Sequence, residues 1–490
     1  MRPRRAICSA LLAFTLAACS SAPILPGSGQ PVASPVAQVS PTPVPIRTLF
    51  PPGEVFEYLV QPGDTLPAVA AHFNTTEAEI RAENPSVPDP VTTLPAGFLL
   101  RVPAYYRPLT SSAFHILPDS EAVNGPGAVE VDLRVEVESR PGYLSRLTDY
   151  AQRRQRPAWD VVNVVAQNYS IHPRLLLALL EYQTHALTDP FPDPTDEIYP
   201  LGHVDVRARG LYRQLIWAAE RFNNAYYGWR GERPVEFELA DGKAARPDPW
   251  QNSGSVGVQG IFAGLHGQED FDRAVGPEGL AATWRALWGD PFADAQITIP
   301  PSLQQPAFGL PFPPNRVWDY TGGPHASWGD SLPYGALDFA PPAVVGGCGL
   351  SNEWFTAPAA GVIARSSDSA VLLDLDGDGD ERTGWVVLFY HVAADGRIAA
   401  GSTVLQGDPL GHPSCEGGRA TGTHFHMARR FNGEWIPAAG VIPFDLDGWV
   451  AGYGEAAYLG TLTRGSQTII ACTCSMAENR ILYELPSIGE

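Results

Sequence analysis

Two histidines near the C-terminal end of the chain, His424 and His426, lie two positions apart in the stretch ATGTHFHM, residues 420–427. Apolar residues follow each of them, and such alternation is typical of a β-strand, in which side chains i and i+2 point to the same face. A strand rises about 3.3 Å per residue, so one imidazole could bind a metal ion while the other acts beside it. Because two surface histidines can share this spacing, further ligands must be found elsewhere in the chain.

Earlier in the chain, a histidine and an aspartate complete a set of metal ligands. His325 follows Gly-Gly-Pro, and Asp338 comes thirteen residues later within YGALDFAP. With His426 they would offer two neutral imidazoles and one carboxylate, a set that suits Zn²⁺ and leaves a fourth position for water. A further histidine, His391, ends the apolar run WVVLFYH and therefore lies at the end of a predicted strand.

The order and spacing of these elements resemble the M23 peptidases, zinc endopeptidases of the lysostaphin and β-lytic type that cut peptidoglycan peptides. Most of that family has HxxxD for its first two ligands, whereas Tyr334 stands four residues before Asp338 here. The β-lytic branch instead has its first histidine thirteen residues before the aspartate, after a Gly-Gly, and His325 has that position. The CEGG run that begins at Cys415 also resembles this branch, so we take the ligand set as complete.

The resemblance implies an antiparallel β-sheet domain over residues 301–490, with zinc as the cofactor at the floor of a groove. The implied zinc ligands are His325, Asp338 and His426. The implied catalytic pair is His391 and His424. Zinc would lower the pKa of its bound water, one histidine of the pair would take the proton, and the other would stabilise the tetrahedral oxyanion.

The cysteines bear on the same domain. Cys348 and Cys415 flank the implied site and could pair in an exported compartment. Cys472 and Cys474 are separated by one residue, and this spacing does not favour a bond between them. One of these two could pair elsewhere.

The N-terminus is expected to be an export signal. Residues 1–18 combine an arginine-rich start with an apolar run that is too short to span a membrane as a helix. They lead into LAAC, which resembles a bacterial lipobox and implies a lipid on Cys19 that would tether the protein to the outer side of the cytoplasmic membrane or within the cell envelope. An ordinary signal with a chance cysteine is the alternative. Residues 19–54 are rich in Pro and Ser and are expected to form an extended linker.

Residues 55–104 are predicted to form a strand, two capped helices and a return strand. This pattern resembles the LysM module, which binds N-acetylglucosamine chains in a groove between its first strand–helix loop and its second helix–strand loop. The resemblance implies that Asn84–Leu94 forms one side of the groove. The residues implied on the other side are Gly63, Asp64, Thr65 and Leu66. A LysM fold that has lost its affinity for glycan is the alternative.

The middle domain, residues 105–300, is expected to be mixed at first and then mostly helical. An alternating run at 128–137 predicts a half-exposed strand, and helices are expected within 146–183, 208–227 and 278–288. The stretch 172–184 resembles the lytic transglycosylases of the lysozyme superfamily, in which the corresponding helix ends in a catalytic Glu-Ser. Here that pair is Gln-Thr, and Glu181 lies on a different helix face, so we expect a lysozyme-like domain without its catalytic acid.

One acidic stretch suggests a second metal. Asp374–Asp380 matches the start of an EF-hand loop, but Trp385 stands where the twelfth position requires glutamate. Because the stretch lies between two predicted strands, a hairpin turn is favoured over a calcium site.

Length and charge complete the prediction. A chain of 490 residues is expected to hold about two to four domains, here a multidomain α+β protein. The net charge of −20 argues against nucleic acid as a partner.

We expect a membrane-tethered peptidoglycan hydrolase, a zinc endopeptidase that holds glycan through LysM. The alternative is a non-catalytic lipoprotein of the same layout that activates amidases or scaffolds the wall. Whether residues 105–300 block the site is left open.

Overall fold

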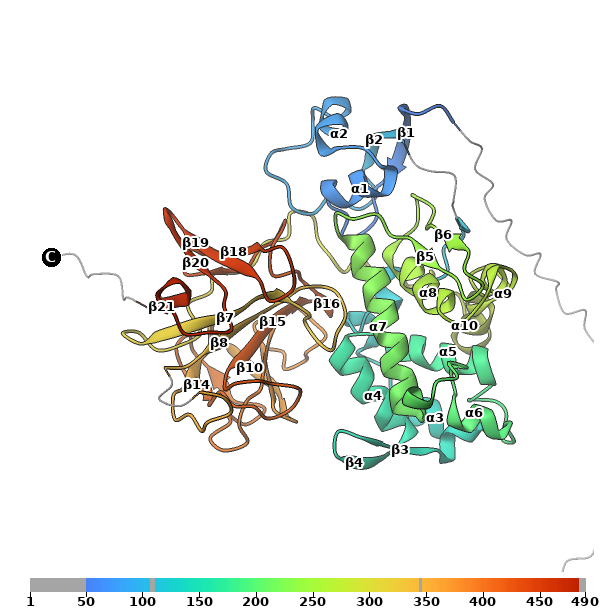
Figure 1. Cartoon of the computed structure of the whole chain (residues 1–490). Helices are drawn as coiled ribbons and strands as arrows, with labels where there is room; N and C mark the ends of the chain where they lie inside the picture. Colours follow the sequence, from blue (N-terminus) through green and yellow to red (C-terminus); the bar gives the residue numbers. More distant parts are fainter. Residues whose placement is uncertain (1–49, 106–110, 343–345, 484–490) are drawn as a thin grey trace, which may run out of the picture. The chain divides into compact units, whose positions relative to one another are not determined.

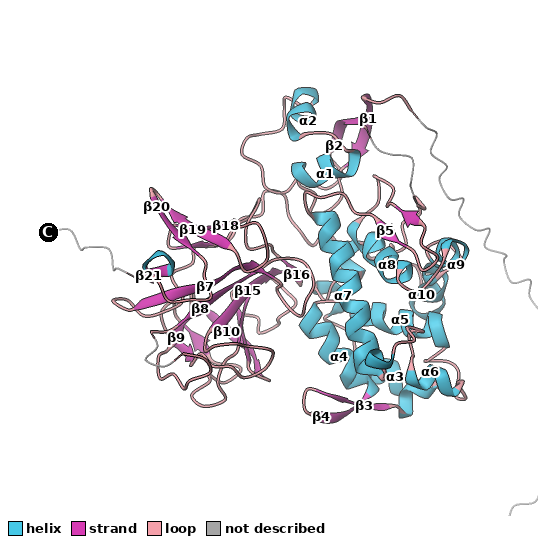
Figure 2. Cartoon of the chain, viewed as in Figure 1, coloured by secondary structure: helices cyan, strands magenta, loops and turns pink. Residues whose placement is uncertain are grey.

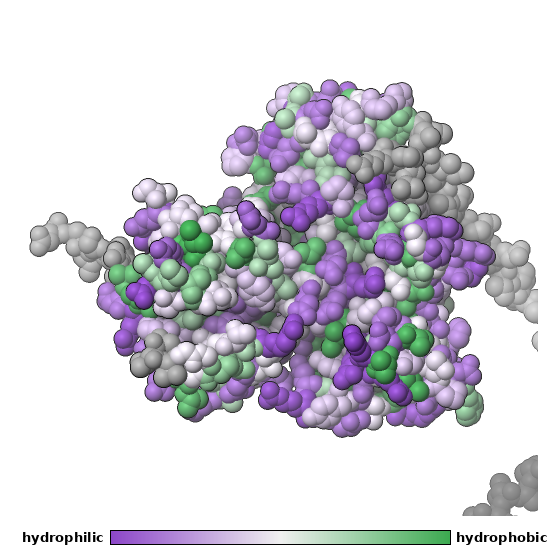
Figure 3. Space-filling view, viewed as in Figure 1, coloured by the Kyte–Doolittle hydropathy of each residue, from purple (hydrophilic) through white to green (hydrophobic). Residues whose placement is uncertain are grey.

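The computed structural model describes residues 50–105, 111–342 and 346–483. The export signal, the lipidated Cys19 and most of the linker were predicted for residues outside these ranges, so they stay predictions. Among the described residues, no helix combines the length and the apolar character that crossing a membrane requires. On the face shown in Figure 3, hydrophobic residues lie as scattered spots between hydrophilic ones.

The LysM-like segment forms β1 (Glu54–Leu59), α1 (Leu66–Phe73), α2 (Glu77–Glu83) and β2 (Leu99–Ala104), drawn in blue in Figure 1. The two strands pair antiparallel, and the side chains of both helices and of both strands meet in one small core. Both helices begin where the sequence predicted caps. The Thr65 hydroxyl accepts a hydrogen bond from the backbone of Ala68, and Thr76 forms a capping box with Glu79.

The strand predicted at residues 128–137 is wrong. The structure has a short turn there and then α3 (Leu133–Glu138), whose N-terminus is capped by Asp132. Leu133 and Val137, four residues apart, are buried, whereas Val135 between them is 59% exposed. The apolar residues at every second position fitted a strand, but only the pair with helical spacing packs into the core.

The helices of the middle domain pack around one apolar core. They are α4 (Ala158–Tyr169), α5 (Pro173–Thr184), α7 (Leu211–Arg230), α8 (Ser253–Ala263), α9 (Gln268–Ala274) and α10 (Leu280–Trp288), whereas the short α6 (Pro194–Ile198) has no buried residue. Helices α7 and α8 approach closely because α8 has glycines at the contact: a methyl group at Gly257 would lie 2.3 Å from the Phe222 ring. The first part of the predicted helical segment 146–183 is instead a hairpin of β3 (Thr148–Ala151) and β4 (Arg154–Pro157).

Short elements complete the middle domain. A small hairpin follows α7, and single 3₁₀ turns connect the longer elements. These elements are β5 (Phe237–Glu238), β6 (Ala244–Ala245), and 3₁₀ turns at Asp119–Glu121, Pro126–Ala128, Tyr143–Arg146 and Val206–Ala208. A further 3₁₀ turn, Ala477–Asn479, lies near the C-terminus of the described residues.

The C-terminal domain contains an antiparallel sheet, which in the described part of the chain has nine strands (Figure 2). Eight of them follow the order β13-β10-β11-β12-β15-β8-β7-β21, and β16 pairs with β15. The strands in chain order are β7 (Val317–His325), β8 (Ala336–Ala340), β10 (Gly361–Ser367), β11 (Ala370–Asp374), β12 (Trp385–Tyr390), β13 (Thr403–Val404), β15 (Phe425–Phe431), β16 (Glu434–Trp435) and β21 (Arg480–Leu482). The fold class predicted from the sequence, multidomain α+β, is confirmed.

Smaller strands extend this domain. Two of them, β9 (Phe355–Thr356) and β14 (Pro409–Gly411), pair with each other. A separate small sheet contains β17 (Asp445–Leu446), β18 (Trp449–Tyr453), β19 (Gly460–Arg464) and β20 (Gln467–Ile470). The turn between β18 and β19 carries Tyr458, which lies against the candidate metal site described below.

The two faces of the large sheet pack against different partners. Leu372, Leu388 and Ala428 belong to the same apolar core as the helices of the middle domain. Their neighbours along each strand, such as Val371, Val387 and Met427, belong to the separate core of the C-terminal domain. Because side chains alternate along a strand, Asp338 and His426 lie on the face that the helical domain also covers.

Candidate metal centre

Strand pairing brings the predicted metal ligands together. Asp338 on β8 lies directly opposite His426 on β15. On the other side of β8, His325 ends β7 and pairs with Ala336. Three strands that are neighbours in the sheet therefore each contribute one ligand residue, although the residues are far apart in the sequence. All three are less than 10% exposed.

Three potential ligand atoms converge on one point. His325 Nε2 lies 3.2 Å from Asp338 Oδ1, and His426 Nδ1 lies 3.4 Å from the same oxygen. The two ring nitrogens are 3.0 Å apart. Tetrahedral zinc with bonds of about 2.0–2.1 Å separates its ligand atoms by roughly 3.3 Å. The three atoms therefore have the spacing that such an ion requires.

Hydrogen bonds on the outer side of each ring fix which nitrogen faces the centre. His325 donates from Nδ1 to the Gly323 carbonyl at 2.8 Å, and His426 donates from Nε2 to the Ser327 carbonyl at 3.1 Å. The nitrogens that face each other thus both present lone pairs, which repel unless a cation lies between them. Among the described residues, the buried Oδ1 of Asp338 has no hydrogen-bond partner. These residues fit a bound metal cation.

The protonation of the ligand residues is consistent with a bound metal cation. Burial alone would raise the pKa of Asp338, but the interactions of its carboxylate with the rings of His325 and His426 hold that pKa well below its usual range. Burial lowers the pKa of His426. The carboxylate is therefore ionised at neutral pH, as a metal ligand must be.

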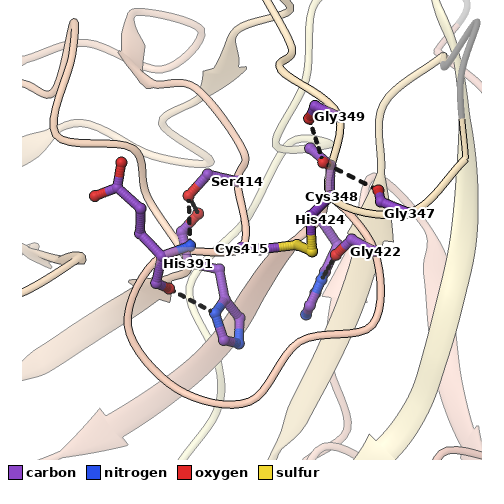
Figure 4. Close-up of a disulfide and its surroundings, with 10 residues drawn as sticks. Gly347, Cys348, Gly349, His391, Ser414, Cys415, Gly422 and His424 are labelled. Atoms are coloured by element: carbon purple, nitrogen blue, oxygen red, sulfur yellow. Dashed lines mark hydrogen bonds between the residues drawn. A yellow bond between two sulfur atoms is a disulfide. The ribbon is translucent and has the colours of Figure 1, made fainter.

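The second pair of predicted histidines lies beside the three ligand residues. The rings of His391 and His424 have centroids 4.6 Å apart, and His424 Nε2 is 3.8 Å from Asp338 Oδ2. Each ring donates from Nδ1 to a carbonyl, His391 to Glu416 and His424 to Gly422, both at 2.8 Å (Figure 4). Both Nε2 atoms thus remain available for another partner. Burial and the two neighbouring histidines lower the pKa of His391 to about 4, so this ring is neutral near pH 7.

The predicted disulfide between Cys348 and Cys415 is present, with the two Cα atoms 5.7 Å apart (Figure 4). Cys415 lies between Ser414 and Glu416, which both hydrogen-bond to His391. Next to Cys348, the carbonyl of Gly347 accepts a hydrogen bond from the backbone of Thr423, the neighbour of His424. The disulfide therefore joins the two loops that orient the second histidine pair.

We expect removal of this disulfide to destabilise the C-terminal domain. Its cysteines are 67 residues apart, and closing a loop of that length restricts the unfolded chain by about 4 kcal/mol in the chain-entropy model. A variant with Cys348→Ser and Cys415→Ser should therefore melt several degrees lower in a thermal denaturation experiment. The matched control replaces Cys472 and Cys474 instead, a pair only two residues apart, and should change the melting temperature much less. Equal shifts in the two variants would contradict this prediction.

The expectation that Cys472 and Cys474 do not bond to each other is wrong. The structure joins them, with their Cα atoms 5.1 Å apart. The chain bends at Thr473, so residues two apart reach the Cα separation that a disulfide needs. Their carbonyls both accept hydrogen bonds from the Asn479 amide, which stabilises the bend.

The acidic stretch after β11 forms a hairpin loop that leads into β12, as the sequence favoured. Asp374, Asp376 and Asp378 each offer a carboxylate oxygen within 4.8 Å of the others. These carboxylates accept hydrogen bonds from backbone N–H groups of the same loop, including those of Asp376 and Gly379. The loop is thus explained by its own turn structure.

The four residues predicted to border the LysM groove have internal partners in the structure. Gly63, Asp64 and Leu66 are buried. The Asp64 carboxylate accepts hydrogen bonds from the Tyr58 hydroxyl at 2.7 Å and from the backbone of Gln61 at 2.8 Å. Thr65 caps α1. Glycan contact by these residues stays a prediction.

The Glu181 side chain also forms hydrogen bonds within the protein. Its carboxylate accepts hydrogen bonds from the backbone of Leu187 at 2.8 Å and from the Thr188 hydroxyl at 2.5 Å. It therefore stabilises the turn after α5. The Gln183 amide lies 3.3 Å from the His266 ring. The expected lack of a catalytic acid in the helical domain stays a prediction.

Two residues near the metal ligands were missed in the sequence. Ser327 supplies the carbonyl that orients His426. Tyr458 stacks on His325, with ring centroids 4.2 Å apart. A backbone carbonyl leaves no residue-type signal, and Tyr458 comes from a strand connection far along the chain, so no motif pointed to either.

Two family models match the chain. The model described as the LasA N-terminal domain matches residues 115–301, and the LysM domain model matches residues 58–103. With the relatives below, they support a LysM plus M23-type peptidase architecture. The middle domain thus matches a LasA-type N-terminal domain, and its likeness to lysozyme stays a prediction.

Among individual proteins, Protease LasA of Pseudomonas aeruginosa strain UCBPP-PA14 is 24% identical over 296 residues, which are 56% of this chain and 66% of LasA. LasA of strain PAO1 is 24% identical over 298 residues. The chain therefore spans just under two thirds of the length of these relatives.

Solved structures also match parts of the chain. The M23 metalloprotease pseudoalterin from the deep sea is 25% identical, with 34% of this chain and 96% of pseudoalterin covered and a TM-score of 0.29. A zinc-containing peptidase from Vibrio cholerae is 18% identical, with 29% and 41% covered and a TM-score of 0.20.

Proposed function

We propose that this protein is a zinc endopeptidase that hydrolyses peptide bonds of peptidoglycan. The observation that carries the proposal is the convergence of His325 Nε2, Asp338 Oδ1 and His426 Nδ1 on one point, next to two further imidazoles with free Nε2 atoms. The relation to Protease LasA supports peptidase activity, and the LysM domain supports the cell wall as the place where it acts.

The residues of the site divide into two roles. His325, Asp338 and His426 would hold the metal, which when bound lowers the pKa of a water molecule and polarises the scissile carbonyl. His391 and His424 are each oriented by a carbonyl that accepts a hydrogen bond from Nδ1, so the Nε2 atom of each ring is left for the substrate. One Nε2 would accept the proton of the attacking water. The other ring, with its Nδ1 proton already donated to a carbonyl, would have to carry a second proton on Nε2 to donate a hydrogen bond to the oxyanion.

We further propose that the protein acts in the cell envelope, tethered by a lipid on Cys19, with LysM as the glycan-binding part. The LAAC sequence supports the tether, and the family match over residues 58–103 supports the wall-binding role. The substrate would reach the site along the part of the sheet face that the helical domain leaves open, where the His424 side chain is 15% exposed.

Metal content and activity measured on the same samples test the proposal. The full chain should bind one zinc per molecule and release new peptide ends from peptidoglycan, and chelation should abolish the release. His426→Ala should lose both the zinc and the activity. His412→Ala is the matched control, because His412 lies in the same domain and binds the Glu353 carbonyl instead. Absence of zinc from the wild type would favour the non-catalytic alternative.

A further inference from the structure

The first loop of the LysM module lies against the end of α7. The carbonyl of Pro62 accepts a hydrogen bond from the guanidinium of Arg230, the last residue of that helix. A methyl group at Gly63 would lie 2.6 Å from Arg230 Nη1, so the guanidinium is in direct contact with this loop. Near the C-terminal end of α1, the ring of His72 stacks on that of Trp229, with centroids 3.7 Å apart.

The guanidinium of Arg230 is held in this position by buried partners. It forms ion pairs of 2.9 Å with Asp119 and with Glu434, and its side chain is only 8% exposed. It also donates to the Tyr226 hydroxyl at 3.1 Å. Buried charges with several partners have one preferred geometry, so Arg230 contacts the LysM loop as a fixed group.

The second loop of the LysM module is bound by a different segment of the chain. The Thr93 hydroxyl donates to the Pro300 carbonyl at 2.7 Å and accepts from the backbone of Leu303 at 2.9 Å. The backbone of Ser302 donates to the Thr93 carbonyl at 2.9 Å. Thr92 donates to the Leu303 carbonyl at 2.8 Å. Thr92 and Thr93 of this loop are therefore bound to residues of the chain itself.

We propose that the glycan groove of the LysM module is an internal docking surface, occupied by Arg230 and residues 300–303, so that a chain of N-acetylglucosamine and this docked arrangement exclude each other. The inference rests on the proposed glycan-binding role of LysM. Both loops that would border a sugar chain already contact other parts of the protein. A glycan chain therefore has to displace Arg230 and residues 300–303 before it can bind.

Displacement of Arg230 would also remove an ion pair with the C-terminal domain. Glu434 belongs to β16, which pairs with β15, and β15 contains the proposed zinc ligand His426. A ligand that binds only the undocked state shifts the equilibrium toward that state, and the coupling is reciprocal. Glycan binding would thus leave Glu434 without its arginine and break the link that Arg230 forms between the Pro62 carbonyl and Glu434.

Binding of a hexamer of N-acetylglucosamine to the full chain tests the inference. Titration calorimetry should show that Arg230→Ala binds the hexamer about tenfold more tightly than the wild type, a typical size for coupling between sites. Arg221→Ala is the matched control, because Arg221 is on the same helix and contacts Trp217 instead. It should bind like the wild type. Thr93→Val removes one hydroxyl from the second loop and should also tighten binding, by a smaller factor.

Hydrogen exchange of the Ser302 and Leu303 amides provides a second readout in the wild type. These amides are bound to Thr93 when the module is docked, so saturating hexamer should speed their exchange. Equal affinities in all variants, or binding with unchanged exchange, would overturn the inference. If Arg230→Ala does not fold, Thr93→Val decides.

The outcome is separable from that of the peptidase proposal. Hexamer binding by none of the proteins would overturn both the glycan-binding role and this inference, whereas cleavage of a soluble wall peptide is measured independently of the LysM module.

Discussion

Asp338→Ala is expected to abolish zinc binding and peptidoglycan hydrolysis together. Asp338 is the only carboxylate among the three converging ligand residues, and its Oδ1 is the atom that both His325 and His426 approach. Loss of a residue that merely orients a metal ligand costs about 10–100-fold in metal affinity, so loss of a ligand should cost more than about 100-fold. Chelator competition measures the affinity, and release of peptide ends measures the activity.

The control for this variant is Asp330→Ala. Asp330 is in the loop between β7 and β8, its side chain is 76% exposed, and it pairs with Arg419 on the surface. This variant should keep its zinc, with activity near that of the wild type. Retention of full zinc affinity by Asp338→Ala would show that the metal is bound elsewhere.

His424→Ala is expected to keep the zinc and lose the activity. His424 Nε2 lies 3.8 Å from Asp338 Oδ2, beside the ligand atoms, and the ring is oriented by the Gly422 carbonyl. Removal of a group that transfers a proton in the transition state costs about 100- to 10,000-fold in rate. Hydrolysis should fall by such a factor at saturating substrate, with zinc content measured on the same sample.

Comparison with Asp338→Ala separates the two roles. If His424→Ala loses zinc to the same extent, the division into ligand and catalytic residues is wrong. If it retains both zinc and full activity, His391 alone has to provide the proton transfer.

The sequence allowed the candidate site to be predicted because its ligands lie in short motifs of fixed spacing. Alternation around His424 and His426 predicted a strand, and the apolar run before His391 predicted the neighbouring one; β15 and β12 do pair. The same is true of the LysM module, in which Thr76 marks the start of the second helix as predicted; the first helix is capped by Thr65 and not by the predicted Gly-Asp turn. Local signals were enough wherever the structure depends on neighbours in sequence.

Features that depend on distant contacts were not predicted. The alternating residues at 133–137 fitted either a strand or a helix, and only the core that buries Leu133 and Val137 decides between them. Arg230 ends an amphipathic helix without any distinguishing motif. Its ion pairs reach residues more than a hundred positions away in both directions, and no periodicity reveals such contacts.

The sharing of one sheet face between two domains has a consequence for how the chain folds. Leu372, Leu388 and Ala428 complete their core only when the helices are in place, so the large sheet on its own would expose an apolar surface. Two halves that each lack a closed core gain their stability together, and they should unfold in a single cooperative transition. Cutting the backbone between them would then leave two chains that still fold as one body.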